Sequence, residues 1–397
     1  MNLAEATDEA LVERVKRMAG MAREPFLPAA IDLLSGMSRA ILADSETKLV
    51  PQYVALAYWM RGAAVKKLAK AFLNTIPDGE ILAPRGLALH LPPTNVDTIF
   101  VYSWALSALA GNANVVRLPA TLSPQAQSLL RVVSKTLADE QQAERNLFGT
   151  YDHGGETERE ICRNVDLRII WGGDAKVEKV SQIPIRPDGL TIGFPDRQSL
   201  TLISAAAYCS ADDEARDDLA ARLFNDAYWF DQMGCSSPRL IVWLGDNPEC
   251  RDDLYNRLEA VIQQKSYIAD PAVGMAKFGL ANDFLAEGVA ASARRYSNEL
   301  QVAEVSQPKV ALQRTTGGGF FGDAQILSLD EVRNFVSRKV QTITHFGFSH
   351  EELISLARSI AGAGGYRIVP VGEALQFEST WDGVPLLSHM TRRIVVR

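Results

Sequence analysis

The sequence has 397 residues, of which 47% are hydrophobic and 22% are charged, with 41 basic residues against 48 acidic ones. These fractions are typical of a globular protein and exclude a disordered chain or a coiled coil. The length predicts two or three domains, at about 100–200 residues each. The formal net charge of −7 is spread along the chain, so no basic patch points to nucleic acid.

The four cysteines stand at positions 162, 209, 235 and 250. Their spacing matches neither a zinc site nor a disulfide framework, so we expect unpaired thiols, no bound metal and a cytoplasmic protein. The N-terminal stretch 1–20 carries acidic residues where a signal peptide needs an apolar core. The uncharged stretch 98–116 is long enough to span a bilayer, but its polar GNAN cluster favours a buried helix followed by a buried strand. We therefore expect no transmembrane segment.

The order of apolar patterns predicts an α/β protein. Helical spacing runs from about Asp8 to Ala43 and from Tyr53 to Leu73. Short apolar runs, typical of buried strands, then alternate with amphipathic helical patterns, which indicates largely parallel sheets. The predicted strands are 86–91, 114–119, 166–171, 199–204, 239–244, 309–314, 340–346 and 366–371, and the helices between them include 121–138, 213–230, 250–264, 329–338 and 350–361. The segment 263–305 predicts only helices and loops.

Two glycine-rich stretches resemble parts of nucleotide-binding fingerprints. The stretch 362–367 follows a helix and precedes a strand, which is the reverse of a dinucleotide turn, so we expect a helix C-cap there. The stretch 317–322 lacks the helix that such a turn needs, and we expect a flexible loop. The common kinase, zincin and α/β-hydrolase motifs are absent from the sequence.

The stretch 231–239, DQMGCSSPR, is the strongest local signal. It joins an amphipathic helix to a strand, where unsatisfied backbone N–H groups favour a thiolate and an oxyanion. Cys235 is therefore a candidate nucleophile, and a small buried cysteine is the alternative. Tyr228, Trp229 and Phe230 just before it are candidates for the wall of an apolar tunnel, with plain core as the alternative.

Three further segments place polar or glycine residues after predicted strands, where open α/β sheets bind ligands. Asn95 follows the first strand and is either an oxyanion donor or a helix N-cap. Gly172, Gly173 and Asp174 follow another strand and fit close approach of a cofactor. Arg117 ends a third strand and is either a phosphate ligand or a surface charge.

These segments, in this order, resemble the aldehyde dehydrogenase superfamily and, within it, the LuxC-type acyl-CoA reductases. The resemblance runs from about Ile81 to the C-terminus. It is carried by GLALHLPPTNV, AGNANVVRLP, IIWGGD, FPDRQSL, FDQMGCSSPRLIVW, RIVPVGEAL and WDGVPLLSHMTR.

The resemblance implies a role for each matching residue. Cys235 falls on the family's nucleophile, and Asn95 falls on the asparagine whose amide joins the oxyanion hole. The positions implied at the cofactor are Pro93, Thr94, Arg117, Gly172, Gly173 and Asp174. Arg117 stands where many aldehyde dehydrogenases have a lysine against the adenosine ribose, which favours NADPH, with NADH as the alternative.

One departure from the hydrolytic aldehyde dehydrogenases is informative. Those enzymes carry a glutamate that activates water to release the acyl-enzyme. The corresponding stretch here, 193–199, has no glutamate, and its Asp196 and Arg197 match the LuxC-type pattern instead. The resemblance thus implies that hydrolysis is slow.

The resemblance also implies the domain organisation. We expect N-terminal helices and a modified Rossmann cofactor domain over 1–208, and a second α/β domain with the thiol nucleophile over 209–375. A C-terminal tail, 376–397, would pack on the cofactor domain or on a partner subunit.

The implied activity is the NADPH-dependent reduction of an acyl-CoA, in particular a fatty acyl thioester, to the aldehyde through an acyl-cysteine. Expected partners are the acyl thioester, an acyl-protein synthetase or other acyl-donating protein, and further copies of the chain. Two alternatives remain open: an acyl-phosphate reductase like the glutamyl-phosphate reductases, and a non-reducing acyl-carrier or scaffold subunit.

Overall fold

The computed structural model describes residues 8–138 and 140–397, and the chain divides into two compact units. The first unit comprises Met1–Pro195 with Phe377–Arg397, and the second comprises Asp196–Gln376. The sequence places the first division near Cys209. The division in the structure lies earlier because the strand predicted at 199–204 pairs with strands of the second unit.

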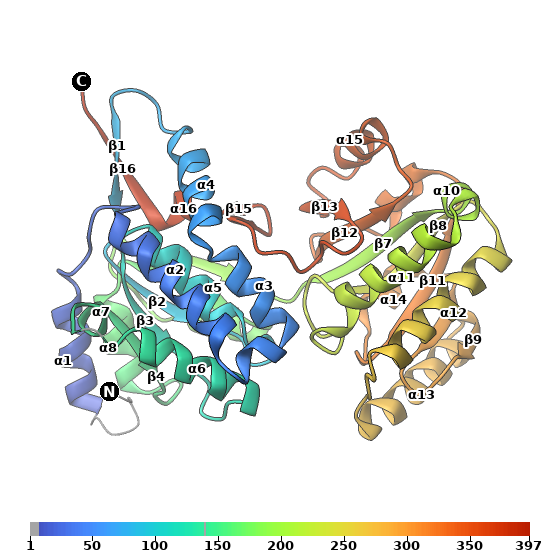
Figure 1. The fold of residues 1–397 in the computed structure, drawn as a ribbon, viewed down its shortest axis with the longest axis horizontal. Helices are drawn as coiled ribbons and strands as arrows, with labels where there is room; N and C mark the ends of the chain where they lie inside the picture. The colour runs from blue at the N-terminus through green and yellow to red at the C-terminus, as the bar shows by residue number, and fades with distance from the viewer. Residues whose placement is uncertain (1–7, 139) are drawn as a thin grey trace. The chain divides into compact units, whose positions relative to one another are not determined.

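The first unit contains helices and a five-stranded sheet (Figure 1). Its helices are α1 (Asp8–Met18), α2 (Pro28–Ala43), η2 (Thr47–Leu49), α3 (Pro51–Trp59), α4 (Gly62–Leu73), α5 (Ile99–Leu109), α6 (Pro124–Thr136), α7 (Glu140–Arg145), α8 (Glu156–Asn164), α9 (Asp174–Ser181) and α16 (Leu386–Met390). Its strands are β1 (Glu80–Pro84), β2 (Leu87–Leu91), β3 (Ala113–Arg117), β4 (Asn146–Gly149), β5 (Leu167–Trp171), β6 (Leu190–Phe194), β14 (Thr380–Trp381), β15 (Val384–Pro385) and β16 (Thr391–Val395).

The five-stranded sheet is parallel throughout, in the order β4-β3-β2-β5-β6. From β2 the chain proceeds outward through β3 to β4, and it then returns to build β5 and β6 on the other side. The order therefore reverses between β2 and β5. In open α/β sheets such a switch point opens a crevice at the carboxyl ends of the two strands.

Both faces of this sheet are covered, which explains the continuous apolar runs in the sequence. One core cluster joins α2, α3, α5 and α6 to the sheet, and another joins α1, α8 and α9 to its opposite face. Every residue of α5 is buried, and β3 is buried except for Arg117 at its end. The expectation of a buried helix followed by a buried strand over 98–116 is confirmed. Within the described residues, no helix is long and apolar enough to cross a membrane.

The C-terminal residues belong to the first unit. β16 pairs antiparallel with β1, and Asn112 Nδ2 donates a hydrogen bond of 3.0 Å to the carbonyl oxygen of Met390. Tyr102 packs against Phe377 and Trp381, with ring centroids 5.3 Å apart in both pairs.

The second unit is built on a seven-stranded sheet (Figure 1). Its helices are α10 (Ala205–Ser210), α11 (Asp213–Tyr228), α12 (Pro248–Gln264), α13 (Pro271–Ala286), α14 (Pro308–Gln313), η3 (Leu329–Asn334) and α15 (His350–Ser359). Its strands are β7 (Gln198–Ser204), β8 (Pro238–Leu244), β9 (Ala290–Arg295), β10 (Gln301–Val305), β11 (Phe320–Ile326), β12 (Val340–Phe346) and β13 (Arg367–Pro370). The strand order is β13-β12-β7-β8-β11-β10-β9, and all pairs are parallel except β9 with β10.

Three sequence expectations in this unit are wrong. The segment 263–305, expected to hold only helices and loops, also contains the strands β9 and β10. β9 is exposed at five of its six positions and therefore has no apolar run to mark it. The run 309–314 is the helix α14 rather than a strand, because Pro308 starts a helix whose buried residues, Ala311 and Leu312, face the core. The stretch 317–322 is not a flexible loop, since β11 begins at Phe320 and each of the three glycines before it makes a backbone hydrogen bond. The helix end expected at 362–367 is confirmed: α15 ends at Ser359 and Gly362 is left-handed, with φ of +81°.

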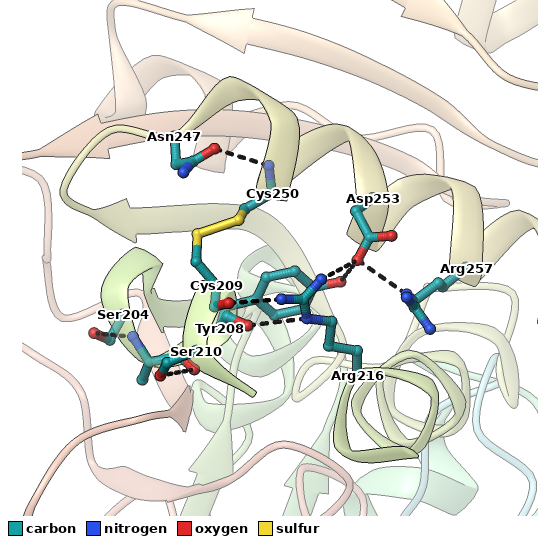
Figure 2. Close-up of a disulfide and its surroundings, with 10 residues drawn as sticks. Ser204, Tyr208, Cys209, Ser210, Arg216, Asn247, Cys250, Asp253 and Arg257 are labelled. Atoms are coloured by element: carbon teal, nitrogen blue, oxygen red, sulfur yellow. Dashed lines mark hydrogen bonds and ion pairs between the residues drawn. A yellow bond between two sulfur atoms is a disulfide. The ribbon is translucent and has the colours of Figure 1, made fainter. Parts of the chain in front are cut away.

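The expectation of four unpaired thiols is also wrong, because Cys209 and Cys250 form a disulfide (Figure 2). Cys209 lies in α10, which follows β7, and Cys250 lies in the first turn of α12, which follows β8. β7 and β8 are neighbours in the sheet, so these cysteines meet although 41 positions separate them. Around the disulfide, Asp253 accepts a hydrogen bond from Tyr208 and pairs with Arg216 and Arg257.

Candidate active site

Cys235 lies on a short loop between α11, which ends at Tyr228, and β8, which begins at Pro238. This is the junction predicted from the sequence. Asp231 and Gln232 adopt left-handed backbone conformations, with φ of +51° and +60°. Non-glycine residues rarely adopt this conformation, and where they do the strain often marks a functional site.

The carbonyl group of Cys235 is fixed from the neighbouring strand. Ser199 in β7 donates a hydrogen bond of 2.7 Å from Oγ to the carbonyl oxygen of Cys235. The same Oγ accepts a hydrogen bond of 3.1 Å from the backbone N–H of Thr342 in β12. Ser236 Oγ donates to Gln341 Oε1 at 3.2 Å. Cys235 thus lies beside the amino ends of three adjacent strands.

Arg239, at the start of β8, supplies positive charge to this region. Burial lowers the pKa of Arg239, and the charges of Cys235 and Asp196 oppose that shift. Its Nε is buried and has no hydrogen-bond partner among the described residues. A guanidinium held near a thiol favours the thiolate form. The sequence analysis missed this residue, although it is the last one of the stretch 231–239.

The other three cysteines are not candidates for the nucleophile. Cys209 and Cys250 are consumed by the disulfide. Cys162 is fully buried, and its burial raises the pKa of the thiol. Arg168 Nη1 donates to Cys162 Sγ at 3.5 Å, which fits a structural role. Cys235 is the remaining thiol, and it is partly exposed.

The three aromatic residues before Cys235 do not share one environment. Tyr228 is buried in the core, stacks on Phe224 with ring centroids 4.9 Å apart, and donates from Oη to the carbonyl oxygen of Glu299. Trp229 is partly buried against the same core cluster. Tyr228 is therefore a core residue, which is the alternative that the sequence left open.

In the first unit, two of the predicted segments meet at the switch point. Pro93, Thr94 and Asn95 follow β2, and Gly172 and Gly173 follow β5, the strand paired with β2. Gly172 is left-handed, with φ of +152°, and a Cβ there would lie 2.7 Å from Lys176 Cδ. This glycine is therefore required both by its backbone conformation and by its neighbour.

Lys176 in α9 spans this switch point, and the sequence analysis did not single it out. Its Nζ donates to the carbonyl oxygen of Pro92 at 2.8 Å, after β2, and to that of Trp171 at 2.9 Å, at the end of β5. Burial lowers the pKa of Lys176 to about 8, and the charge of Arg117 contributes to the shift. A lysine three residues after a strand-ending WGG is the only local signal that marks it.

Arg117 stands at the carboxyl end of β3, as predicted. Its Nε and Nη2 donate to the carbonyl oxygen of Tyr151 at 3.1 and 2.9 Å. Burial lowers the pKa of the half-buried guanidinium. The guanidinium is thereby held by two of its nitrogens.

His90 is a structural residue beneath this edge. It is fully buried, and burial lowers its pKa to about 4. Asn114 donates through Nδ2 to the carbonyl oxygen of Asn112, so its Oδ1 accepts from His90 Nε2 at 3.1 Å. Nδ1 then accepts from Ser103 Oγ at 2.7 Å. Both ring nitrogens are satisfied in the neutral form.

The structure thus brings Pro93, Thr94 and Asn95, after β2, and Gly172 and Gly173, after β5, to the carboxyl end of the sheet, with Arg117 at the end of the neighbouring strand β3. Asp174 is the exposed first residue of α9. Cys235 belongs to the other unit. Among the described residues, no group of three or more His, Cys, Asp or Glu side chains is placed to hold a metal ion.

Comparisons with known proteins give one family and one fold. A family model described as acyl-CoA reductase (LuxC) matches residues 66–272. No curated protein matches the chain in sequence.

The fold is that of the aldehyde dehydrogenases. An NAD-dependent aldehyde dehydrogenase from Sinorhizobium meliloti superposes with a TM-score of 0.69 at 15% identity, over 98% of this chain and 86% of that one. An NADP-dependent glyceraldehyde-3-phosphate dehydrogenase from Bacillus halodurans C-125, solved with NADP, gives a TM-score of 0.65 at 13% identity, over 98% and 90%. Aldehyde dehydrogenase 21 from Physcomitrella patens gives 0.69 at 10% identity, over 98% and 90%.

Proposed function

The chain belongs to the acyl-CoA reductase (LuxC) family, whose model matches more than half of its residues, and we propose that it reduces an acyl-CoA thioester to the aldehyde through an acyl group carried on Cys235. Family membership makes the protein an oxidoreductase. The fatty acyl substrate, the covalent intermediate and the choice of cofactor are the proposal.

One observation supports Cys235 more than any other. Of the four cysteines, two are joined in the disulfide and Cys162 is fully buried, which leaves Cys235 as the partly exposed thiol. The positive charge of Arg239 and the hydrogen bond from Ser199 to the Cys235 carbonyl support a thiolate held in a fixed position.

The reaction balances as two transfers. The Cys235 thiolate attacks the thioester carbonyl, a C–S bond forms to the protein, and the bond to coenzyme A breaks with release of its thiolate. Backbone N–H of Cys235 and the Asn95 amide are the proposed donors to the tetrahedral oxyanion. After reduction of the protein thioester, the hemithioacetal collapses, releases the aldehyde and regenerates the Cys235 thiolate.

The residues at the carboxyl edge of the first sheet fit a nicotinamide dinucleotide. Gly172, whose left-handed backbone favours glycine, follows β5 at the switch point, where open α/β sheets bind dinucleotides. Arg117 and Lys176 supply positive charge suited to its phosphates. When bound, the reduced cofactor supplies the hydride. We propose NADPH, because a guanidinium at the end of β3 suits a 2′-phosphate, with NADH as the alternative.

The absence of a glutamate in the stretch 193–199 supports reduction over hydrolysis. Without that glutamate to activate water, we propose that the acyl-cysteine persists until hydride transfer. An acyl-protein synthetase or another acyl-donating protein is a further proposed source of the acyl group, and a homo-oligomer is the proposed working form.

The test is a direct assay of the purified protein. With a panel of acyl-CoA chain lengths, NADPH should be oxidised and aldehyde released. Cys235→Ala should abolish turnover. Incubated with labelled acyl-CoA and no cofactor, the wild-type protein should keep a covalent acyl label after denaturation, and Cys235→Ala should not. Turnover that persists in Cys235→Ala would exclude this nucleophile. If an acyl phosphate is reduced faster than acyl-CoA, the substrate class is acyl phosphates, and Cys235 remains the proposed nucleophile.

A further inference from the structure

Gln232 is a fully buried polar residue on the loop that carries Cys235. Its Oε1 accepts hydrogen bonds from the backbone N–H groups of Gly319 and Phe320, each at 3.0 Å. Its Nε2 donates to the carbonyl oxygens of Pro238 at 2.9 Å and Phe320 at 3.0 Å. All four hydrogen-bonding positions of the amide are therefore used.

The identity of this side chain is specified by its partners. Two N–H groups face one end of the amide and two carbonyl groups face the other, which only a carboxamide satisfies in full. A carboxylate in the same place lacks both donors. A methionine of similar shape lacks donors and acceptors, and would remove all four of these hydrogen bonds.

The four bonds fix both ends of the segment that contains Cys235. The bond from Gln232 to Pro238 closes the loop from its first turn to the start of β8, with Cys235 midway between them. Within the loop, the N–H of Ser237 donates to the carbonyl oxygen of Gly234 at 3.0 Å. The bonds to Phe320 attach the closed loop to β11.

The same residue lies in the strained part of the loop. Asp231 and Gln232 are consecutive non-glycine residues in the left-handed region, a conformation that persists only where the surroundings hold it. Asp231 is held by the N–H of Gly318, which donates to its carbonyl oxygen at 2.8 Å, and by Tyr267 Oη, which donates to its carboxylate at 2.8 Å. Gln232 provides the remaining constraint from within the core.

Gly318 is itself held in place. Lys277, a buried lysine in α13, donates from Nζ to the carbonyl oxygen of Gly318 and, at 2.6 Å, to that of Asn298. Burial lowers the pKa of Lys277 to about 8. The platform against which the Cys235 loop rests is therefore built from backbone groups with buried side chains behind them.

From these contacts we propose that Gln232 is a positioning residue for the thiol: it holds the Cys235 loop in the conformation in which the thiolate is formed and aimed. Gln232 does not touch substrate. This inference rests on the proposed role of Cys235 and adds the element that sets its geometry and reactivity.

The experiment compares Gln232→Met and Gln232→Glu in the full chain with Thr344→Val as the matched control. Thr344 Oγ1 lies 2.7 Å from Thr201 Oγ1, and both residues are fully buried in the same sheet. Thr344→Val removes this buried hydrogen bond of the second unit without changing a residue of the Cys235 loop. For each protein, the rate of Cys235 alkylation by iodoacetamide is measured against pH, with Cys235→Ala as the blank, beside kcat and KM for acyl-CoA.

For Gln232→Met we expect the midpoint of the alkylation profile to move by about one pH unit toward the value of about 8.5 for an ordinary cysteine. We expect kcat to fall by about 100-fold, as for a misplaced reacting group, with KM within about threefold. Gln232→Glu keeps both accepted hydrogen bonds, so its alkylation midpoint and its kcat should lie between those of Gln232→Met and those of the wild-type protein. Thr344→Val should keep both the profile and kcat.

An unchanged alkylation profile and kcat in Gln232→Met, at a loss of stability like that of Thr344→Val, would overturn the proposal and leave Gln232 as core. If Gln232→Met does not fold, the same comparison made with Gln232→Glu decides. Alkylation needs neither acyl-CoA nor cofactor, so it tests the positioning role separately from the proposed function. If the wild-type protein shows no reductase activity but Gln232→Met still shifts the alkylation profile, the proposed function is refuted and the positioning role of Gln232 stands.

Discussion

Ser199 Oγ donates a 2.7 Å hydrogen bond to the carbonyl oxygen of Cys235, and Ser199 Oγ itself accepts a hydrogen bond of 3.1 Å from the N–H of Thr342. One hydroxyl thus joins the candidate nucleophile to two strands. Ser199→Ala leaves the Cys235 carbonyl and the Thr342 N–H without this partner. We expect the free energy of unfolding to fall by about 1–3 kcal/mol, the cost of unpaired buried groups. Urea denaturation measures it.

We expect Ser199→Ala also to lower kcat, because the Cys235 backbone loses its anchor. Thr201→Val is the control: Thr201 lies on the same strand, is fully buried and loses one hydroxyl contact, to Thr344. We expect Ser199→Ala and Thr201→Val to lose equal amounts of stability, and only Ser199→Ala to lose kcat. Equal turnover in the two variants would show that the bond to Cys235 has no catalytic effect.

The Cys209–Cys250 disulfide predicts a stability that depends on reductant (Figure 2). It closes a loop across a separation of 41 positions, and loop-closure entropy of that size corresponds to about 4 kcal/mol. Dithiothreitol should therefore lower the urea midpoint of the wild-type protein. The double variant Cys209→Ser, Cys250→Ser should start at the lower midpoint and be indifferent to dithiothreitol.

A thiol titration provides the independent check. Unfolded without reductant, the protein should expose the thiols of Cys162 and Cys235 only. If all four cysteines react under those conditions, the disulfide does not form in solution. The sequence analysis could not pair Cys209 with Cys250, because their meeting depends on β7 and β8 being neighbours and no local spacing encodes that.

The sequence predicted seven of the parallel strands, and those such as β2, β5, β7 and β8 are buried and read as continuous apolar runs. It missed the parallel strands β4, β6, β10 and β11. Where that signal fails, the prediction failed. β9 is exposed at five of its six positions and has no apolar run. The run 309–314 is too short for its period to separate helix from strand, and the packing of Ala311 and Leu312 decides in favour of α14.

The site divides in the same way. Cys235, Asn95 and Arg117 carry recognisable chemistry next to recognisable strands, so the sequence singles them out as candidates. Gln232 and Lys176 act through hydrogen bonds to backbone groups far along the chain, such as Phe320 and Pro92. Only the folded structure shows these contacts, because the partners of both side chains are backbone groups rather than particular residue types.

Asp226 predicts a pH dependence of stability. Its carboxylate accepts from the N–H groups of Gly372 at 2.7 Å and Ala374 at 3.0 Å, yet burial outweighs these bonds and raises its pKa to about 7. The charge of Arg367 also opposes the shift, and that of Glu373 adds to it. Between its unfolded pKa of about 4 and about pH 7, the folded protein holds a proton that the unfolded chain has released.

The folded state therefore binds more protons in this window, and the contribution of Asp226 to stability falls as pH rises through it, by about 4 kcal/mol for a shift of about three units. Asp226→Asn should remove that part of the slope between pH 5 and pH 8, measured by urea denaturation. Asp218→Asn, at an exposed carboxylate on the same helix, is the control. A slope that survives in Asp226→Asn would assign it to other groups.

Arg117 predicts the choice between the two nicotinamide cofactors. Its Nε and Nη2 are fixed on the Tyr151 carbonyl oxygen, so the guanidinium stays in place at the end of β3 and Nη1 is the nitrogen we assign to a 2′-phosphate. Charge-assisted hydrogen bonds of this kind are worth about 1.5–3 kcal/mol, which corresponds to about 10- to 100-fold in affinity. Arg117→Met should weaken NADPH binding by that factor and leave NADH binding within about threefold.

Arg145 provides the matched control in the same unit. Its Nε and Nη2 also donate to backbone carbonyl oxygens, those of Met21 and Gly111, and burial likewise lowers its pKa. It precedes β4, however, and so stands at the amino end of the sheet. Arg145→Met should cost stability without changing the ratio of the two cofactor affinities, measured by nicotinamide fluorescence. Two results would contradict this prediction: an equal change of the ratio in both variants, or a loss of NADH affinity in Arg117→Met as large as its loss of NADPH affinity. In either case Arg117 does not bind the 2′-phosphate, and its guanidinium serves only to hold the Tyr151 segment.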